Sequence, residues 1–451
     1  MTTRAEPVPP PAAAGLLSVE AARDAVLAEV VPVGTERVIA SAALGRVVAE
    51  PVVASVSLPP WPNSAMDGYA LRASDTLGAT DDKPVVLRVV GDVAAGAEPG
   101  VAIGAGTAAR IATGARLPDG ADAVVPVELT TPLDASGRTG PRGRDATGPL
   151  PASCLVHQAV PIGGSIRDQG SDLQAGTSLL EPGAAMTPAA VGLVAGAGVV
   201  DLRVHRRPRV GVLATGDEVR APGQPLGGAG IPDANGPGLR AQVTAAGGEA
   251  IDLGIASDDL ADVLRRLRGG IEVDADALII SGGVSVGPYD VVKTAMEAIG
   301  RVDLWRVAVQ PGKPFAFGVA PRPDGGAPIL VFGLPGNPVS SAVTFELFVR
   351  PAIRRLAGRV DLFRPTDRAV LVDPATKSHG RRAYLRVRAD RTQDGAPVRD
   401  DRGRVQVRLA GTQGSHVLSG LAAADALAII LESDDSLPPG ADVDIWWLDS
   451  A

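Results

Sequence analysis

Between residues 187 and 358, short apolar runs alternate with helical patterns. The apolar runs are continuous, as is typical of parallel strands that are buried on both faces. Segments with the i, i+3, i+4 spacing of helices follow them. This order predicts a doubly wound α/β sheet with right-handed crossovers. The strands are expected in RVGVLAT (209–215), AIDLGI (250–255), ALIIS (277–281) and ILVFG (329–333).

The regions on either side have a different pattern. Between Pro51 and about Pro151, short runs such as PVVLRVVGDV alternate with Gly- and Pro-rich turns, which predicts a small β domain. After Gly358, runs such as AYLRVRA alternate apolar and polar residues, which predicts a separate β barrel or sandwich. Near the N-terminus, SVEAARDAVLAEV (18–30) has the pattern of an amphipathic helix.

Composition excludes several classes of protein. The net charge is −8 and no long basic run occurs, so the basic stripe of a nucleic-acid-binding protein is missing. Cys154 is the single cysteine, which fits a reducing compartment because no disulfide can form within the chain. No apolar run approaches the ~18 residues of a membrane span, and the N-terminus lacks a signal-peptide pattern. We therefore expect a cytoplasmic protein that binds neither nucleic acid nor membranes.

Four polar loops lie where ligands collect in a doubly wound sheet, at the carboxyl ends of its strands. In SGGVSVGPYD (281–290), Gly282 and Gly283 lack a Cβ atom, so backbone amides can approach an oxyanion closely, and Ser281 and Ser285 add hydroxyl groups. Each loop alone also fits an ordinary turn, but four loops at one edge favour an anion site. The other three are TGDEV (215–219), QPGKP (310–314) and GLPGNPVS (333–340).

Side chains in and near these loops suit an anion and a divalent cation. Lys313 lies between two prolines, which restrict the backbone that carries its ammonium group. Asn337 or Ser340 could cap the helix that follows. Four carboxylates could position Mg²⁺ against a pyrophosphate, although each alone also fits a surface or capping carboxylate. They are Asp217, Glu218, Asp233 and Asp290.

Two polar turns in the first half of the chain, one around Asp67 and one around Thr113, complete the set of motifs. With them, the chain resembles the molybdopterin molybdenumtransferases, which are bacterial molybdenum-insertion enzymes, and the C-terminal domain of gephyrin. The matching stretches occur in the order of that family and span the chain from about residue 18 to its end. They are NSAMDGYA, RIATGARLPDGADAVVPVE, SIRDQGSDL, LATGDEV, SGGVSVGPYD, QPGKPFAFG and GLPGNPVSSAVTFELF.

The resemblance implies a domain organisation and a reaction. An elongated N-terminal domain would comprise residues 16–52 and 152–186, with a β domain (53–151) inserted between its two parts. A molybdopterin-binding α/β domain (187–358) and a C-terminal β domain (359–451) would follow. The enzyme would be a homodimer whose active site lies between the α/β domain of one subunit and the inserted β domain of the other. With Mg²⁺, it would convert adenylylated molybdopterin and molybdate to molybdenum cofactor and AMP.

The resemblance also implies roles for individual residues. The family's catalytic positions correspond to Asp67, Thr113, Asp290, Lys313 and Ser340. Mg²⁺ ligands are implied among Asp217, Glu218, Asp233 and Asp290. Arg386 in AYLRV and Ser415 in GSH would reach molybdate from the C-terminal domain. The implied substrate-binding residues are Thr215, Gly216, Ser281, Gly282, Gly283, Ser285, Pro311, Gly312, Pro314, Pro335, Gly336, Asn337, Arg386 and Ser415.

Some positions depart from the family pattern. Ser171-Asp172 stands where an acidic pair is common, Gln310 where many members have lysine, and Pro62 and Pro288 where acidic or polar residues are usual. These departures leave open a paralogue that prefers tungstate. Two further alternatives are a scaffold protein of the gephyrin type and the adenylyltransferase that resembles the α/β domain alone. The adenylyltransferase and molybdoenzymes are also expected as partners.

Overall fold

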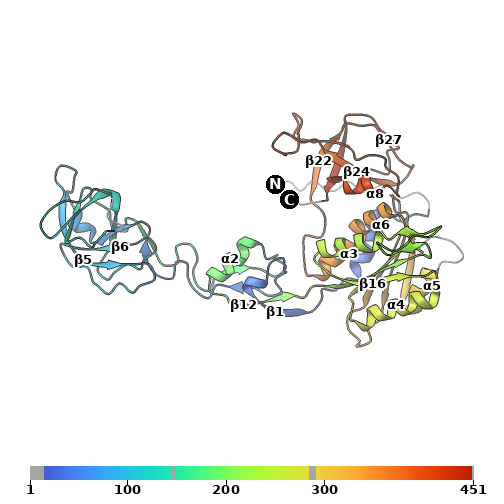
Figure 1. Cartoon of the computed structure of the whole chain (residues 1–451), viewed down its shortest axis with the longest axis horizontal. Helices are drawn as coiled ribbons and strands as arrows, with labels where there is room; N and C mark the ends of the chain where they lie inside the picture. The colour runs from blue at the N-terminus through green and yellow to red at the C-terminus, as the bar shows by residue number, and fades with distance from the viewer. Residues whose placement is uncertain (1–14, 144–147, 284–290, 449–451) are drawn as a thin grey trace.

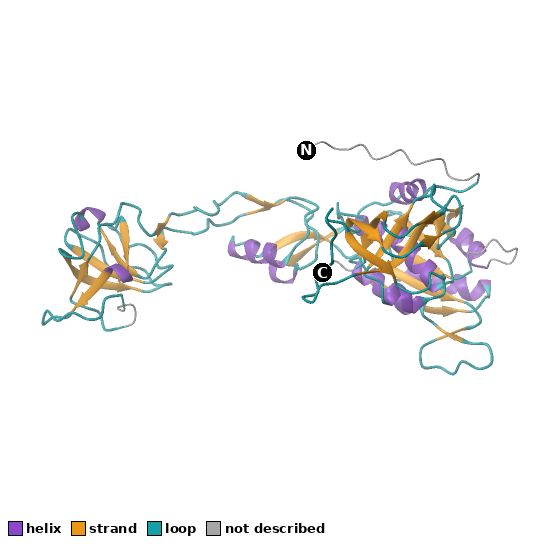
Figure 2. Ribbon diagram, turned by 90° about the horizontal axis from the view of Figure 1, so that it is seen from above, coloured by secondary structure: helices purple, strands orange, loops and turns teal. Residues whose placement is uncertain are grey.

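The computed structural model describes residues 15–143, 148–283 and 291–448 and arranges them as an elongated molecule (Figures 1 and 2). A β domain lies at one end and a small linking domain in the middle, while the α/β domain and the C-terminal β domain pack together at the other end. The predicted fold class, a doubly wound α/β domain combined with β domains, is confirmed. Within the described residues, no helix combines the length and the apolar character that crossing a membrane requires.

The α/β domain is built on a sheet with the strand order β16-β13-β17-β21-β20-β18. The strands β16, β13, β17 and β21 are parallel, and the antiparallel pair β20–β18 extends one edge. Helices α4 and α5 cover one face, and α1, α3, α6 and α7 pack on the other. The strands are β13 (Arg209–Thr215), β16 (Glu249–Ala256), β17 (Ala277–Ser281), β18 (Arg301–Arg306), β20 (Pro314–Ala320) and β21 (Ile329–Leu334), and the helices are α1 (Val19–Ala28), α3 (Asn235–Ala245), α4 (Leu260–Glu272), α5 (Val291–Ile299), α6 (Pro338–Thr344) and α7 (Arg350–Leu356).

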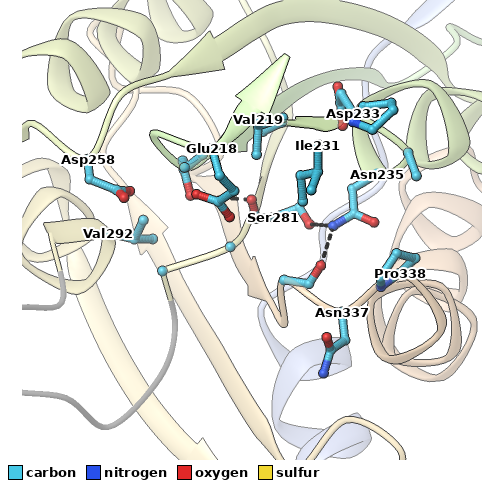
Figure 3. A pocket seen from close by; sticks show the side chains of 18 of the residues that line it. Glu218, Val219, Ile231, Asp233, Asn235, Asp258, Ser281, Val292, Asn337 and Pro338 are labelled. Atoms are coloured by element: carbon cyan, nitrogen blue, oxygen red, sulfur yellow. Dashed lines mark hydrogen bonds between the residues drawn. The ribbon is translucent and has the colours of Figure 1, made fainter. Parts of the chain in front are cut away.

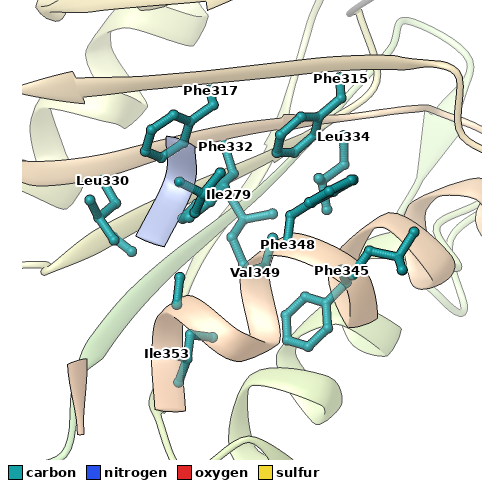
Figure 4. Packing of buried hydrophobic residues seen from close by; sticks show 14 of the residues in the cluster. Ile279, Phe315, Phe317, Leu330, Phe332, Leu334, Phe345, Phe348, Val349 and Ile353 are labelled. Carbon is teal, nitrogen blue, oxygen red and sulfur yellow. The ribbon is translucent and has the colours of Figure 1, made fainter. Parts of the chain in front are cut away.

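Phenylalanine side chains fix the helix that carries one of the site loops. Five of the six phenylalanines of the chain gather between the sheet and the segment from α6 to α7 (Figure 4). Phe315 stacks on Phe348 with ring centroids 4.5 Å apart, and Phe317 contacts Phe332 at 5.3 Å. Aromatic rings bury a large apolar area, so this contact anchors α6 at the carboxyl edge of the sheet.

The C-terminal domain is a closed barrel, because β26 pairs with both β28 and β24. Its interior is apolar, and β19 of the preceding domain adds to its strand β24. This shared ladder joins the barrel to the α/β domain. The elements are β19 (Val309–Gln310), β22 (Thr366–Leu371), β24 (Arg382–Ala389), β25 (Val405–Leu409), α8 (Leu418–Ala422), β26 (Ala426–Ile430) and β28 (Ala441–Trp447).

Three segments pack differently from the domain boundaries expected from the sequence. Helix α1 buries Val19, Ala22 and Val26 in the core of the α/β domain and does not join the linking domain. Helix α2 (Pro188–Gly196) and β12 (Asp201–His205) belong to the linking domain, where β12 pairs with β1 (Thr35–Ile39). Strand β9 (Ser153–Val156) pairs with β5 and β8, so the inserted sheet continues beyond residue 151.

The inserted β domain is joined to the rest by two paired chain segments, which we call the stalk (residues 54–62 and 168–177; Figure 2). Leu58 and Leu173 exchange backbone hydrogen bonds of 2.7 and 3.1 Å across it. Short ladders close both ends, one between β2 and β11 and one between β3 and β10. The sheet order beyond the stalk is β7-β4-β6-β5-β9-β8. The strands are β2 (Val52–Val53), β3 (Asn63–Ser64), β4 (Gly68–Leu71), β5 (Val85–Val93), β6 (Thr107–Ile111), β7 (Ala123–Pro126), β8 (Thr130–Leu133), β10 (Ile166–Arg167) and β11 (Ser178–Leu180).

Candidate functional site

A cavity of about 1110 Å³ lies at the carboxyl edge of the α/β sheet (Figure 3). Loops after β13, β17 and β21 and the start of α3 form its walls, at the position expected for a doubly wound sheet. His416 from the barrel also lines it. Ser285 and Asp290, predicted for the same loop as Ser281, lie outside the described residues. The predicted residues that line the cavity are Thr215, Gly216, Glu218, Asp233, Ser281, Gly282, Gly283, Gly336 and Asn337.

The two glycines after β17 are required by the backbone and by the close approach of neighbouring groups. Gly282 and Gly283 have φ angles of 105° and 64°, which side chains rarely allow. A Cβ atom on Gly282 would lie 2.6 Å from Oγ1 of Thr215, and one on Gly283 would lie 2.4 Å from Val292. The loop therefore presents main chain, with amide groups, to the cavity.

Asn235 at the start of α3 connects two walls of the cavity and was missed by the sequence reasoning. Its side-chain amide donates to Oγ of Ser281 at 2.8 Å and to the carbonyl oxygen of Gly336 at 2.7 Å. Figure 3 shows both bonds crossing from α3 to the facing loops. Because Ser281 is buried, this amide holds the ends of β17 and β21 together.

The acidic residues of the site have different roles. Glu218 and Asp233 line the cavity, and so does Asp258, which was not predicted from the sequence. Asp217 and Asp258 hydrogen-bond reciprocally, each accepting from the other's backbone N–H, at 3.3 and 3.1 Å. Among the described residues, no three His, Cys, Asp or Glu side chains are grouped closely enough to hold a metal ion by themselves. The carboxylate of Asp217 is thus engaged in joining two loops.

Beside the cavity, at the contact between the barrel and the α/β domain, lies a buried cation. Arg386 is 0% exposed, and its guanidinium donates to the carbonyl oxygens of Thr412 at 2.8 Å and Gly414 at 3.2 Å. Its Nε atom has no partner, and no carboxylate among the described residues pairs with it. Burial lowers the pKa of Arg386. A buried cation without a counter-ion is costly, so the position favours a bound anion.

The start of α6 contacts Ser415, which follows the Gly414 carbonyl group that Arg386 binds. The backbone N–H of Val339 donates to the carbonyl oxygen of Ser415 at 3.1 Å, and the side chain of Asn337 donates to Oγ of Ser415 at 3.1 Å. Asn337 occupies the N-cap position of α6, but its side chain makes this bond to the barrel and does not cap the helix. Because Asn337 also lines the cavity, the cavity and the buried arginine are neighbours.

The loop that carries Lys313 packs against the same helix. Gly312 has a φ of 106°, and a Cβ atom there would lie 2.5 Å from Thr344 and 3.5 Å from the carbonyl oxygen of Ser340. Pro311 and Pro314 enclose this glycine and Lys313. The loop therefore lies beside Ser340, which is buried. We name Lys313, Ser340, Arg386 and Ser415 the seam cluster.

Asp67 and Thr113 are brought together, but in the inserted β domain. Oδ1 of Asp67 accepts hydrogen bonds from the backbone N–H of Thr113 at 2.7 Å and from its hydroxyl group at 2.9 Å. Both residues are exposed. The inserted domain lies at the opposite end of the molecule from the cavity (Figure 1), so within one chain this pair and the cavity are separate.

The departures from the family pattern lie in two places. Oε1 of Gln310 accepts a hydrogen bond from the backbone N–H of Ser378 at 2.8 Å, so this side chain ties the Lys313 loop to the barrel. Ser171 and Asp172 lie in the stalk, where Asp172 N–H donates to Leu58. Pro62 accepts a hydrogen bond from Leu117 in the inserted domain. Pro288 lies outside the described residues.

The comparisons with known proteins agree with this architecture. The family model described as "MoeA N-terminal region (domain I and II)" matches residues 17–198. "Probable molybdopterin binding domain" matches residues 211–355, and "MoeA C-terminal region (domain IV)" matches residues 368–448.

Individual relatives and structures are similar over nearly the whole chain. Molybdopterin molybdenumtransferase 2 of Mycobacterium tuberculosis is 39% identical over 410 residues, covering 90% of this chain and 93% of the relative. Molybdopterin molybdenumtransferase of Haemophilus influenzae is 32% identical, covering 95% and 98%. The crystal structure of a molybdopterin biosynthesis MoeA protein from Pyrococcus horikoshii matches with a TM-score of 0.76 at 30% identity, covering 97% of this chain and all of that one.

Fold, site and comparisons together define a transferase of molybdenum cofactor biosynthesis. The chain belongs to the molybdopterin molybdenumtransferase family.

Proposed function

We propose that the protein inserts molybdate into adenylylated molybdopterin and releases AMP, with the help of Mg²⁺. The observation that carries this proposal is Arg386, a buried cation without a carboxylate partner among the described residues. Molybdate is a tetrahedral dianion, which arginine and lysine groups, hydroxyl groups and amides bind well. The seam cluster offers these groups and few carboxylates, so it suits an oxyanion better than a cation.

The neighbouring cavity suits the larger substrate. Its volume of about 1110 Å³ is slightly above the range of about 300 to 1,000 Å³ that is usual for small-molecule sites, which suits a pterin joined to an adenylate through two phosphates. The backbone N–H of Gly282 donates to the carbonyl oxygen of Leu334 at 3.1 Å, so the main chain at Gly283 is the part of this pair that can donate an amide hydrogen bond to a phosphate oxygen. In this arrangement the pterin and its phosphates occupy the cavity, and molybdate lies beside them at the seam cluster.

Glu218 would hold the Mg²⁺ ion together with substrate phosphates and water. Asp233 would assist through its second carboxylate oxygen, because its Oδ1 accepts from the backbone N–H of Gly236 at 2.9 Å. Mg²⁺ commonly takes only one or two protein carboxylates in phosphate sites, so the absence of a three-residue cluster among the described residues is compatible with it. The carboxylate of Glu218 folds over Gly216, where a Cβ atom would lie 2.7 Å from it, and no described residue hydrogen-bonds to it. When bound, the ion would stabilise charge as the phosphoanhydride breaks.

In the reaction, the residues of the seam cluster would bind molybdate, and those of the cavity would bind the phosphates. An oxygen atom of water or of molybdate would attack the adenylyl phosphorus, the bond to the bridging oxygen would break, and molybdopterin would leave with its own phosphate. The adenylyl group would be released as AMP, directly where water attacks, or after water displaces molybdate from it. Lys313 and Arg386 would hold the molybdate dianion, with Ser340 and Ser415 donating hydroxyl hydrogen bonds. Asn235 would keep the two loops at the phosphates in register. These groups are placed before the reaction begins, which is how preorganised charges lower a barrier.

A second copy of the chain would complete the site. The exposed Asp67–Thr113 pair lies in the inserted domain, away from the cavity of its own chain (Figure 1). In a two-fold symmetric homodimer, the inserted domain of each subunit would reach the cavity of the other. Through this reaction the protein would receive its substrate from the adenylyltransferase and supply molybdoenzymes in the cytoplasm.

The test is AMP release from adenylylated molybdopterin by the purified protein with Mg²⁺, with and without molybdate. Molybdate-dependent release that stops when Mg²⁺ is chelated is the expected result. Release with tungstate but not with molybdate would make the protein a tungstate-preferring paralogue. No release with either anion, from a folded dimer, would overturn the enzymatic proposal in favour of a scaffold.

Replacing Asn235 with alanine is expected to raise the KM for adenylylated molybdopterin about tenfold, because two hydrogen bonds between loops are lost. The Kd for molybdate should stay unchanged, since the seam cluster is held by other contacts. Gln242→Ala is the matched control, because Gln242 lies on the same helix and donates to Ala342 and Glu346 away from the cavity. Equal changes in both variants would show that Asn235 supports α3 and has no specific part in the site.

A further inference from the structure

An ion-pair network crosses the contact between the α/β domain and the barrel. Arg382, the first residue of β24, pairs with Glu20 of α1 and, through two bonds of 3.1 and 3.2 Å, with Glu432 of the barrel. The arginine and Glu432 are largely buried, with side-chain exposures of 13% and 9%. Burial acts to lower the pKa of Arg382, but Tyr384, Glu20 and Glu432 outweigh it and raise that pKa. The arginine therefore stays charged and joins two domains.

Glu20 is firmly attached to the α/β domain. Its helix α1 is capped by Ser18, whose Oγ accepts from Ala21 N–H at 3.1 Å. The apolar side of α1 is part of the core that contains Phe345 and Phe348. The Glu20–Arg382 pair thus connects a helix that is packed in the α/β domain with the first residue of β24 in the barrel.

The alternation of β24 connects Arg382 with the seam cluster. Ala383, Leu385 and Val387 fill the barrel, whereas Tyr384 packs in the core shared with the α/β domain. Side chains two residues apart lie on the same face of a strand. Arg382, Tyr384 and Arg386 therefore form one row that faces the α/β domain, with the ion-pair network at one end and the buried arginine of the seam cluster at the other.

The same strand also positions the loop of Lys313. Strand β19 pairs with β24 so that Val309 lies opposite Arg382 and Gln310 opposite Ala383. Arg382 N–H donates to the carbonyl oxygen of Ala308 at 2.8 Å. The chain then continues directly through Pro311 and Gly312 to Lys313. On its other side Lys313 is followed directly by β20 of the α/β sheet, whose first residue, Pro314, pairs with Arg306. A shift of β24 relative to the α/β domain would therefore change the separation of Lys313 and Arg386.

We propose that Glu20 and Arg382 are positioning residues for the oxyanion site, and that their ion pair sets the separation of Lys313 and Arg386 and thereby the affinity for molybdate. This inference rests on the proposed function, because it takes the seam cluster as the molybdate site. Neither residue would touch the substrate.

The test is molybdate binding by the full-length protein, measured calorimetrically for the wild type and for Glu20→Gln. This variant removes the charge of the Glu20–Arg382 pair, leaves Arg382 paired with Glu432, and keeps the β19–β24 ladder between the domains. The Kd for molybdate is expected to rise about tenfold, whereas the Kd for AMP, which reports on the adjoining cavity, stays unchanged. Arg382→Lys keeps the charge but loses the planar fork, so an intermediate Kd is expected.

Glu29→Gln is the matched control. Glu29 ends the same helix and pairs with Arg301 inside the α/β domain, so its loss should leave both Kd values unchanged. Equal molybdate affinity in the wild type and Glu20→Gln would overturn the inference, and so would parallel losses of molybdate and AMP binding. A wild-type protein that binds AMP but no molybdate would instead overturn the molybdate site itself.

Discussion

Replacing Arg386 with glutamine is expected to lower molybdate-dependent AMP release by about 100-fold or more, because a charge-assisted contact to the dianion is lost. The folded protein should be as stable as the wild type or more stable. Arg386 is fully buried and has no counter-ion among the described residues, so removing its charge also removes a desolvation cost. Turnover and the thermal unfolding midpoint, measured on the same preparation, would check both expectations.

Arg388→Gln is the control for this prediction. Arg388 lies two residues further along β24 and is exposed, so its replacement changes the net charge equally without entering the seam cluster. It should retain wild-type turnover. If Arg386→Gln keeps its turnover but unfolds at a much lower temperature, the buried arginine serves the barrel and the molybdate assignment is wrong.

Mixing two inactive variants is expected to restore activity. Asp67→Ala damages only the inserted domain, and Arg386→Gln damages only the cavity side of the site. In a mixed dimer, the undamaged cavity of one subunit meets the undamaged inserted domain of the other. After subunit exchange at equal concentrations, about half of the dimers are mixed and one of their two sites is intact, so about a quarter of wild-type AMP release should return.

The double variant, with both substitutions in one chain, is the control for the mixing experiment. Mixed with the wild type, it places one damaged element in each site of a mixed dimer, so the mixed dimers should be inactive. If the two single variants stay inactive together although subunits exchange, each active site is formed within one chain. The proposed part of Asp67 in a shared site would then be wrong.

The α/β domain could be predicted from the sequence because its strands are buried on both faces. The run ALIIS is apolar up to its last residue, Ser281, and the structure places all five of these residues in the interior. The loops at the carboxyl edge followed from the topology, and nine of the predicted site residues line the cavity. Helix α1 was also predicted, but its apolar face does not specify a partner, so its packing on the α/β domain was not anticipated.

The residues that the sequence could not reveal act through tertiary contacts. Asn235 is an ordinary helix-start residue by pattern, and only the fold brings its amide to Ser281 and Gly336. The burial of Arg386 could not be predicted, because AYLRVRA alternates apolar and polar residues, and that pattern predicts a strand with one exposed face. In the structure, both faces of β24 are covered from Ala383 to Val387. Asp217 fits a metal site by composition, but its carboxylate is used by the backbone of Asp258.

The stalk has a mechanical consequence. Two backbone segments, paired at Leu58 and Leu173, are the connection between the inserted domain and the body of the subunit. Such a connection resists stretching but bends more easily than a packed interface. A small rotation at the base of the stalk would displace the inserted domain by a larger distance, because that domain lies at the far end of the stalk.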